Sequence, residues 1–245
     1  MTFFRDDATG IVMCGDEEIP YTVVHSKRRT LGIHVYSDAR VVVRAPFFTR
    51  RSTIKKRIDG KADWIQKKIH DLKALPPREP ALQYTEGEQH LYLGSAYPLR
   101  IMKGKHSAVV LTPQAIEITV RGEVKAIRIK KILDSWYRVQ AVNVFGERIA
   151  RCVPRVPGVK AKHITRVSIR AMKTRWGSLS RKGSLNLNLA LIRAELACID
   201  YVVIHELCHF KRYAHDKKYY ALLENILPDW KRYKKKLNGM RLLSS

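Results

Sequence analysis

The chain has 245 residues, of which 45% are hydrophobic, so it can fill the core of one large domain or two modest ones. Lysine and arginine outnumber aspartate and glutamate by 47 to 22, which gives a formal net charge of +25. This composition argues against a disordered chain, and no run approaches the roughly 20 apolar residues of a membrane-spanning helix. The first ten residues, MTFFRDDATG, place two aspartates where a signal peptide has its apolar run, so we expect a cytoplasmic protein.

The N-terminal part shows strand patterns followed by a helical pattern. β-Branched and aromatic side chains cluster in three short runs separated by polar turns, at residues 19–25, 31–37 and 40–46. These runs predict an antiparallel sheet. Over residues 49–72, isoleucines recur at steps of three and four among basic residues, which predicts one amphipathic helix. The prolines of LPPREPA then favour a linker, so we expect a first domain at 1–80 and a second at 81–245.

The second part also mixes strands and helices, and we predict an α+β fold. A second group of strand patterns spans residues 89–120 and precedes a long helix at 123–152. We expect the buried stripe of this helix to comprise Ile129, Ile132, Leu133, Trp136, Val139, Val142 and Ile149. Two further strands, at 164–172 and 184–192, are joined by a turn around TRWGSLSRKG and lead into another helix.

That last helix carries the pattern HExxH. On a helix, His205 and His209 lie four residues apart on one face and can present two imidazole nitrogens to a single ion. Glu206 is offset by one residue and can reach a metal-bound water as a general base. Neutral imidazoles suit Zn²⁺, so we predict zinc as the cofactor of a hydrolase. Cys208, within the same helix, is expected to be a small buried group and not a ligand.

A catalytic zinc site of this kind needs a third protein ligand. His215 follows His209 at the spacing of the signature HExxHxxGxxH, although Arg212 replaces the glycine that lets the chain turn. We therefore predict His215 as the third ligand and a turn that is built differently. Glu224, in the next helical stretch, is the alternative.

The segment from Arg170 to Tyr220 resembles the YgjP-like metallopeptidase domain, also called the DUF45 family. The resemblance is carried by MKTRWGS at 172–178, LNLNLAL at 185–191 and IDYVVIHELCHFKRYAHDKKYY at 199–220. It implies a zincin-like fold in which His205, His209 and His215 hold zinc and Glu206 is catalytic. The chain is also similar to the WLM and SprT-like peptidases. It departs from the family pattern at positions outside the expected ligands, where it has Leu179, Ala194 and Tyr219-Tyr220.

The substrate has two candidate classes, because members of the resembled family include peptidases and nucleotide pyrophosphatases. We favour a peptidase, since the strand SLNLNLAL, which runs into the metal helix, can align an extended peptide. Arg175 and Tyr219 are the expected substrate-binding residues. Arg175 is expected either to face a substrate carboxylate or phosphate, or to pair with an acidic neighbour. Trp176 is expected either beside the substrate or capping the core. The basic surface also suits nucleotides or nucleic acid bound without sequence preference, and a nucleic-acid-binding protein with a relic metal site is a further alternative.

Overall fold

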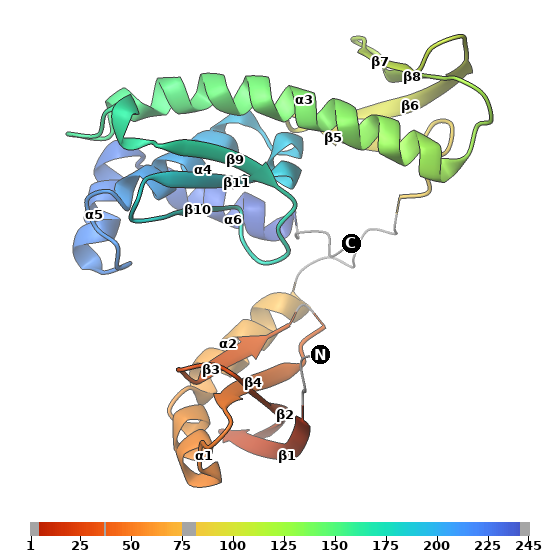
Figure 1. The fold of residues 1–245 in the computed structure, drawn as a ribbon. Helices are drawn as coiled ribbons and strands as arrows, with labels where there is room; N and C mark the ends of the chain where they lie inside the picture. The colour runs from red at the N-terminus through yellow and green to blue at the C-terminus, as the bar shows by residue number, and fades with distance from the viewer. Residues whose placement is uncertain (1–4, 37, 75–81, 241–245) are drawn as a thin grey trace. The chain divides into compact units, whose positions relative to one another are not determined.

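The computed structural model describes residues 5–36, 38–74 and 82–240, and the chain divides into two compact units, Met1–Glu79 and Pro80–Ser245 (Figure 1). The expected linker at 75–81 lies outside the described residues. Among the described residues, no helix combines the length and apolar character needed to cross a membrane.

The first unit is a four-stranded sheet with two helices packed on it. The strands are β1 (Arg5–Cys14), β2 (Glu17–Ser26), β3 (Gly32–Val35) and β4 (Val41–Pro46), in the order β1-β2-β4-β3. The helices are α1 (Arg51–Asp59) and α2 (Ala62–Lys73). Valines from the sheet and isoleucines from the helices form its core, at Val12, Val23, Val43, Ile54, Ile58, Ile65 and Ile69.

Three expectations for this unit need correction. The sheet is mixed and not purely antiparallel, because β4 inserts between β2 and β3 and runs parallel to β2. Strand β1 was not predicted, since its sequence RDDATGIVMC begins with polar residues. The single helix expected at 49–72 is divided at Gly60, a residue with low helix propensity, so that α2 starts anew after Lys61.

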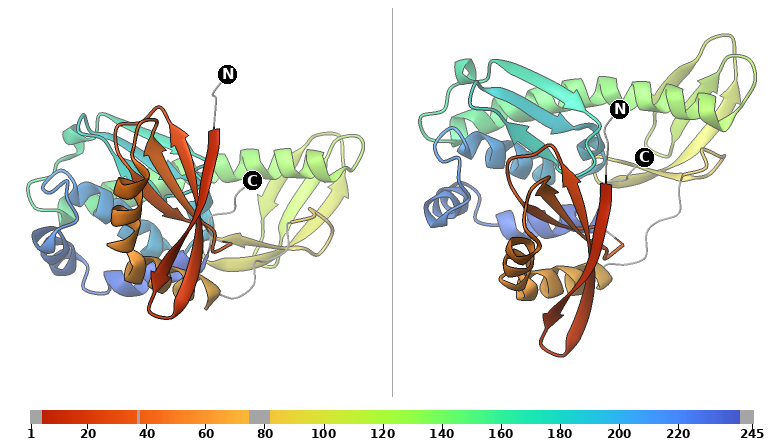
Figure 2. Two further views of the ribbon diagram at one scale, coloured as in Figure 1. Left: turned by 90° about the horizontal axis from the view of Figure 1, so that it is seen from below. Right: turned by 60° about the horizontal axis from the view of Figure 1, so that its bottom comes forward.

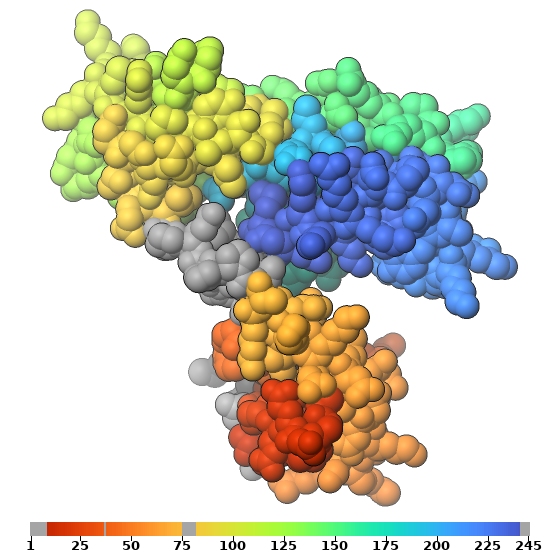
Figure 3. Space-filling view, turned by 180° about the vertical axis from the view of Figure 1, so that it is seen from behind, coloured from red at the N-terminus to blue at the C-terminus, as the bar shows by residue number. Residues whose placement is uncertain are grey.

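The second unit is built along one long helix, α3 (Ala126–Cys152). At its N-terminal end lies a four-stranded sheet of β5 (Gln89–Tyr92), β6 (Ser95–Lys103), β8 (Ile116–Val120) and β7 (Ala108–Leu111), in that order. At its C-terminal end lies a three-stranded sheet of β10 (Gly177–Leu179), β11 (Ser184–Asn188) and β9 (Arg166–Arg170) (Figure 2). The C-terminal helices are α4 (Leu196–Cys208), α5 (Lys217–Ile226) and α6 (Trp230–Gly239), and the last two form a continuous surface region (Figure 3). Short 3-10 turns occur at Val153–Arg155, Ala161–His163 and Leu189–Arg193.

The buried face of α3 differs in part from the expected stripe. Ile129, Leu133 and Ile149 are buried as predicted, whereas Val139 and Val142 are 56% and 57% exposed. The other buried positions are Tyr137, Ala141 and Phe145, which continue the four-residue step, and Cys152 at the end of the helix. Apolar residues lie on more than one side of this helix, so periodicity alone does not identify the side that packs.

The segment between the two predicted strands also differs from expectation. What we expected to be a turn at 174–183 contains a strand, β10, which pairs with β11 in antiparallel register from Gly177↔Leu187 to Leu179↔Leu185. The predicted strand at 184–192 ends at Asn188 and continues as a 3-10 turn. Strand β11 is therefore central, with β10 on one side and β9 on the other. The strand with an open edge next to α4 is β10, and not SLNLNLAL as we expected.

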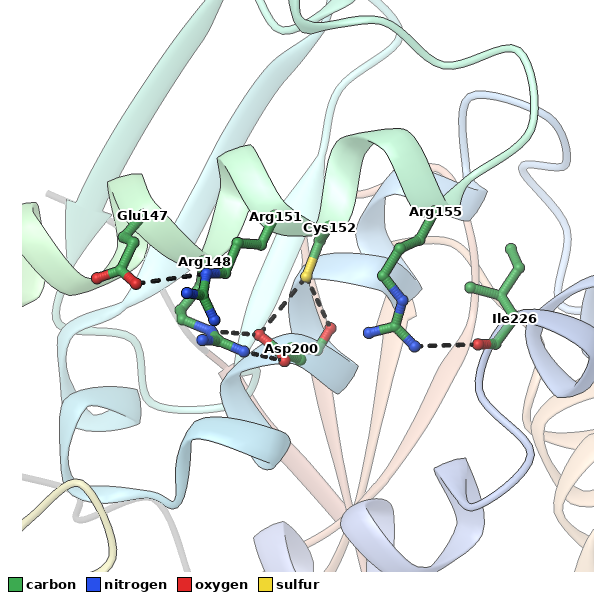
Figure 4. A network of polar contacts seen from close by, with 7 residues as sticks. All are labelled: Glu147, Arg148, Arg151, Cys152, Arg155, Asp200 and Ile226. Atoms are coloured by element: carbon green, nitrogen blue, oxygen red, sulfur yellow. Dashed lines mark hydrogen bonds and ion pairs between the residues drawn. The ribbon is translucent and has the colours of Figure 1, made fainter.

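A polar contact fixes the start of α4 against α3. Arg148 on α3 makes a two-pronged ion pair with Asp200 on α4, in which Nε donates to Oδ1 at 2.6 Å and Nη2 contacts Oδ2 (Figure 4). The thiol of Cys152 lies 3.5 Å from the same carboxylate. Two parallel contacts between planar groups restrict rotation as well as separation. The ion pair therefore sets the rotation of α4 five residues before His205.

Candidate metal centre

Helix α4 is apolar on nearly every side, which buries it and the polar groups it carries. Ten consecutive or near-consecutive positions between Cys198 and Cys208 are buried, and Glu206 itself is only 5% exposed. A helix of this kind belongs in the interior of a domain. Polar groups held there need partners, because an unpaired polar group away from water costs free energy.

Three histidines converge beside this helix. His205 lies in the last turn of α4, His209 is its C-cap, and His215 comes from the following loop. One nitrogen of each lies within 4.8 Å of the other two, and the Nε2 atoms of His205 and His215 are 3.1 Å apart. His209 Nδ1 is hydrogen-bonded to the carbonyl of Arg212 at 2.9 Å, which orients its ring. The structure thus brings together the three histidines that the sequence singled out.

The loop to His215 turns without a glycine. The backbone N–H groups of Phe210, Lys211 and Arg212 donate to carbonyls of Leu207 and Cys208, so the last helical turn tightens and closes. Residues 209–216, all described, contain no positive φ angle. Since only a left-handed conformation favours glycine, Arg212 is compatible with this turn. Asp216 then caps α5 by accepting the backbone N–H of Tyr219 at 2.8 Å.

Tyr219 supports the histidines from behind and does not face the solvent. Its side chain is fully buried, and its hydroxyl donates to the backbone carbonyl of His205 at 2.9 Å. Its ring stacks on that of His209, with centroids 5.0 Å apart and an interplanar angle of 26°. These contacts leave no surface for a substrate, so we replace the expected substrate-binding role of Tyr219 with a positioning role. Sequence patterns do not reveal that a residue on α5 reaches back to α4.

Burial favours the neutral form of two of the imidazoles. The pKa of His205 is lowered to about 3 by burial and by the neighbouring His215 and His209. The pKa of His215 is lowered by burial and by the neighbouring His209 and Lys234. Neutral imidazole is the form that binds a metal ion. Two ligands of one tetrahedral Zn²⁺ lie roughly 3.3 Å apart, given bonds of about 2.0–2.1 Å. The donor type and the 3.1 Å separation of His205 and His215 therefore fit zinc.

Glu206 lies against strand β10. A Cβ atom added to Gly177 would be 2.8 Å from Oε1 of Glu206, so only glycine leaves room for the carboxyl at this point. Burial raises the pKa of Glu206 to about 7, opposed by a backbone hydrogen bond from Leu179 and by the charge of Arg175. The requirement for Gly177 was not predicted, although the RWGS motif contains it.

The other candidate residues occupy distinct places. Arg175 is exposed at the start of β10 and acts electrostatically on Glu206, while Trp176 is half-buried against the core. The carboxyl of Glu224 accepts a hydrogen bond from Trp230 Nε1 at 2.7 Å and pairs with Lys231, and it is absent from the histidine cluster found among the described residues. Cys208 is fully buried with a free thiol, as expected.

The buried carboxyl predicts a pH-dependent stability of the metal-free protein. Between pH 4.5 and about 7, folded Glu206 keeps a proton that the unfolded chain has released. The free energy of unfolding therefore falls as pH rises through this window and stays lower above it. Glutamine does not titrate, so Glu206→Gln does not lose stability in this way. The free energy of unfolding of the variant minus that of the wild type should therefore increase from pH 4.5 to pH 8 by on the order of 1–3 kcal/mol. Urea unfolding in the presence of a chelator, followed by tryptophan fluorescence, measures this difference, and an advantage independent of pH would contradict it.

Comparison with known proteins gives one family match and similar solved structures. The family described as YgjP-like, metallopeptidase domain, matches residues 29–240. Two solved structures are similar over part of the chain. The metallopeptidase zymogen jannalysin of Methanocaldococcus jannaschii is 20% identical with a TM-score of 0.35, covering 39% of this chain and 88% of that one. The metallopeptidase zymogen abylysin of Pyrococcus abyssi is 20% identical with a TM-score of 0.34, covering 38% and 90%.

No curated protein matches the chain. The family match includes α4, the loop to His215 and the RWGS segment, which are the parts that form the histidine cluster and the wall beside Glu206. It also extends over most of the chain, from residue 29 in the first unit to residue 240 at the end of the second. The chain therefore belongs to the YgjP-like metallopeptidase family.

Proposed function

We propose that the chain is a zinc-dependent peptidase with a zincin-like site, in which His205, His209 and His215 hold the metal and Glu206 is the general base. The observation that carries this proposal is the convergence of three imidazole nitrogens next to a buried carboxyl group. Membership of a metallopeptidase family supports a peptide or protein as the substrate.

Different residues of the site have different roles in the hydrolysis of a peptide. Zinc, when bound, supplies a Lewis acid that activates water and polarises a carbonyl group. Glu206 accepts a proton from water at its carboxylate and then delivers it to the departing amine. A backbone hydrogen bond from Leu179 and the charge of Arg175 favour the carboxylate form of Glu206, which is the form that accepts the proton. Tyr219 holds His205 and His209 in place through its hydroxyl and its ring.

The open edge of β10 is the part of the site that suits an extended peptide. The backbone carbonyl of Trp176 accepts a hydrogen bond from the N–H of Asn188, and the N–H of Ser180 donates one to the carbonyl of Ser184. The backbone groups of Trp176 and Ser180 therefore point toward β11. Backbone groups alternate in direction along a strand, and those of Gly177 and Leu179 therefore point toward the open edge. A peptide added there would run past Glu206, since the backbone of Leu179 already contacts that carboxyl group.

Metal content and substrate class can be tested on one preparation. Elemental analysis of the purified protein should find about one zinc per chain, because three imidazoles leave one coordination position open. The same protein should hydrolyse an unfolded protein and leave nucleoside triphosphates intact. Hydrolysis of the triphosphates without peptide cleavage would favour the nucleotide pyrophosphatase alternative. An absence of zinc affinity tighter than micromolar would remove the basis for either enzyme.

A further inference from the structure

The sheet beside the metal centre is formed by a stretch of chain that carries only positive charge. Residues 148–194 contain 12 lysines and arginines and no aspartate or glutamate. This stretch includes β9, β10 and β11. This stretch supplies 12 of the 25 net positive charges of the chain, and part of it forms the wall along which we propose that the substrate lies.

Two arginines of this stretch stand at the two ends of β10. Arg175 precedes the strand and Arg181 follows it, and both side chains are exposed. Arg175 is close enough to Glu206 to lower its pKa. The guanidinium of Arg181 lies 5.3 Å from the ring centre of Tyr213, whose ring stacks in turn on that of His209 at 6.2 Å. Both arginines thus border the metal centre.

Neither arginine forms an ion pair with a described carboxylate, although Arg175 interacts at longer range with Glu206. Carboxylates elsewhere around the centre are occupied, since Asp216 caps α5 and Glu224 binds Trp230 and Lys231. A positive wall whose arginines are not ion-paired attracts an anionic ligand.

Helix α6 adds a third cation on another side of the centre. Lys234 lies 5.5 Å from the ring centre of Trp230 and acts electrostatically on His205 and His215. It forms no ion pair with a described carboxylate, in contrast to its neighbours Lys231 and Lys236, which bind Glu224 and Glu195. Lys234 therefore lies near two of the three histidines, on a different element from Arg175 and Arg181.

We propose that this site selects acidic peptides, with aspartate or glutamate within about three residues on each side of the cleaved bond. The proposal rests on the proposed peptidase function. Arg175 and Arg181 each lie three residues from Ser178 at the centre of β10, with Arg181 in the turn that follows the strand, so each is at most roughly 10 Å from Ser178 along the chain. A peptide paired with β10 would carry its side chains past both arginines. A nucleic acid lacks the backbone amides that pair with a strand edge, so the geometry favours a peptide over another polyanion.

The test uses the zinc-loaded full chain and three peptides of equal length. One peptide has glutamates at the third position on each side of the cleaved bond, and in the others these are glutamines or lysines. One exposed ion pair contributes up to about fivefold, and the acidic peptide can form two. We therefore expect kcat/KM to be roughly tenfold higher for the acidic peptide than for the neutral one, and at most about 25-fold higher. This ratio should fall toward one at high salt.

Charge reversal makes the test specific to the two arginines. The double substitution Arg175→Glu and Arg181→Glu should reverse the order, so that the lysine peptide becomes the better substrate, with zinc content and circular dichroism unchanged. Arg166→Glu is the matched control, because Arg166 is an exposed arginine of the same stretch on β9, the opposite edge of the sheet. It should keep the wild-type preference.

Three outcomes would overturn the inference. Equal cleavage of the three peptides, or a preference that the double substitution leaves intact, would reject acidic selectivity and leave the peptidase function standing. Inhibition by a single-stranded DNA oligonucleotide at concentrations below the peptide KM, lost in the double variant, would assign the arginines to nucleic acid. Cleavage of none of the peptides, together with loss of activity on any unfolded protein, would instead reject the peptidase function.

Discussion

Replacement of Glu206 by glutamine is expected to abolish hydrolysis while the protein keeps its zinc. The substitution preserves the size and hydrogen-bonding shape of the side chain and removes the basic carboxylate. Because Glu206 is offset from the histidine cluster, zinc content should remain near one per chain. The value of kcat should fall by roughly 10²- to 10⁴-fold, the usual contribution of a general base. Peptide cleavage and elemental analysis on the same sample measure both quantities.

Glu224→Gln is the matched control for this experiment. Glu224 is also a glutamate near the centre, but its carboxyl group binds Trp230 and Lys231. This variant should retain kcat within a few-fold of the wild type. Full activity of Glu206→Gln, or equal losses in the two variants, would show that Glu206 is not the base.

His215→Ala should weaken the binding of zinc itself. The remaining cluster would offer two imidazoles, which is fewer than the three protein ligands of catalytic zinc sites. Changes that only reorient a ligand cost 10–100-fold in metal affinity, so we expect the loss of His215 to weaken zinc binding by at least roughly 100-fold. Competition with a chelator of known affinity measures this change. Activity should return in part with excess zinc, because Glu206 and β10 are unaltered.

The corresponding test of the alternative ligand is Glu224→Ala. Its carboxyl group is directed to α6, so its removal should leave zinc affinity unchanged. If His215→Ala retained full zinc while Glu224→Ala lost it, the third ligand would be Glu224 and the spacing argument for His215 would be wrong. The two variants therefore distinguish the candidates in one measurement.

The sequence was sufficient for features that depend on local spacing. A four-residue step places His205 and His209 on one side of α4 in any α-helix, whatever surrounds it. The continuous apolar run around them predicted that this helix is buried, and the structure agrees. The long helix α3 was also predicted within three residues of its bounds, because a helix of that length shows its periodicity many times.

Strand pairing was harder to predict from the sequence, because a pattern of alternating side chains does not indicate which strand lies next to it. The sheet of the first unit was expected to be antiparallel, yet β2 and β4 are parallel. The three residues of β10 are too few to show an alternation, so they were assigned to a turn. The same limit explains why we expected the strand at 184–192 to align a peptide: β11 has the stronger strand pattern, but both its edges are paired.

The sequence by itself determined the chemistry that this protein has at its disposal: two histidines and a glutamate on one helix, a third histidine six residues later, and a strongly basic surface. Only the tertiary structure decided which groups meet. It turned the chain after His209 without a glycine, brought Tyr219 behind the histidines, directed Glu224 away, and set Gly177 against Glu206. Local patterns depend on neighbours in the chain, whereas these contacts join α4 to α5, α6 and β10 through packing between separate elements, which no periodicity records.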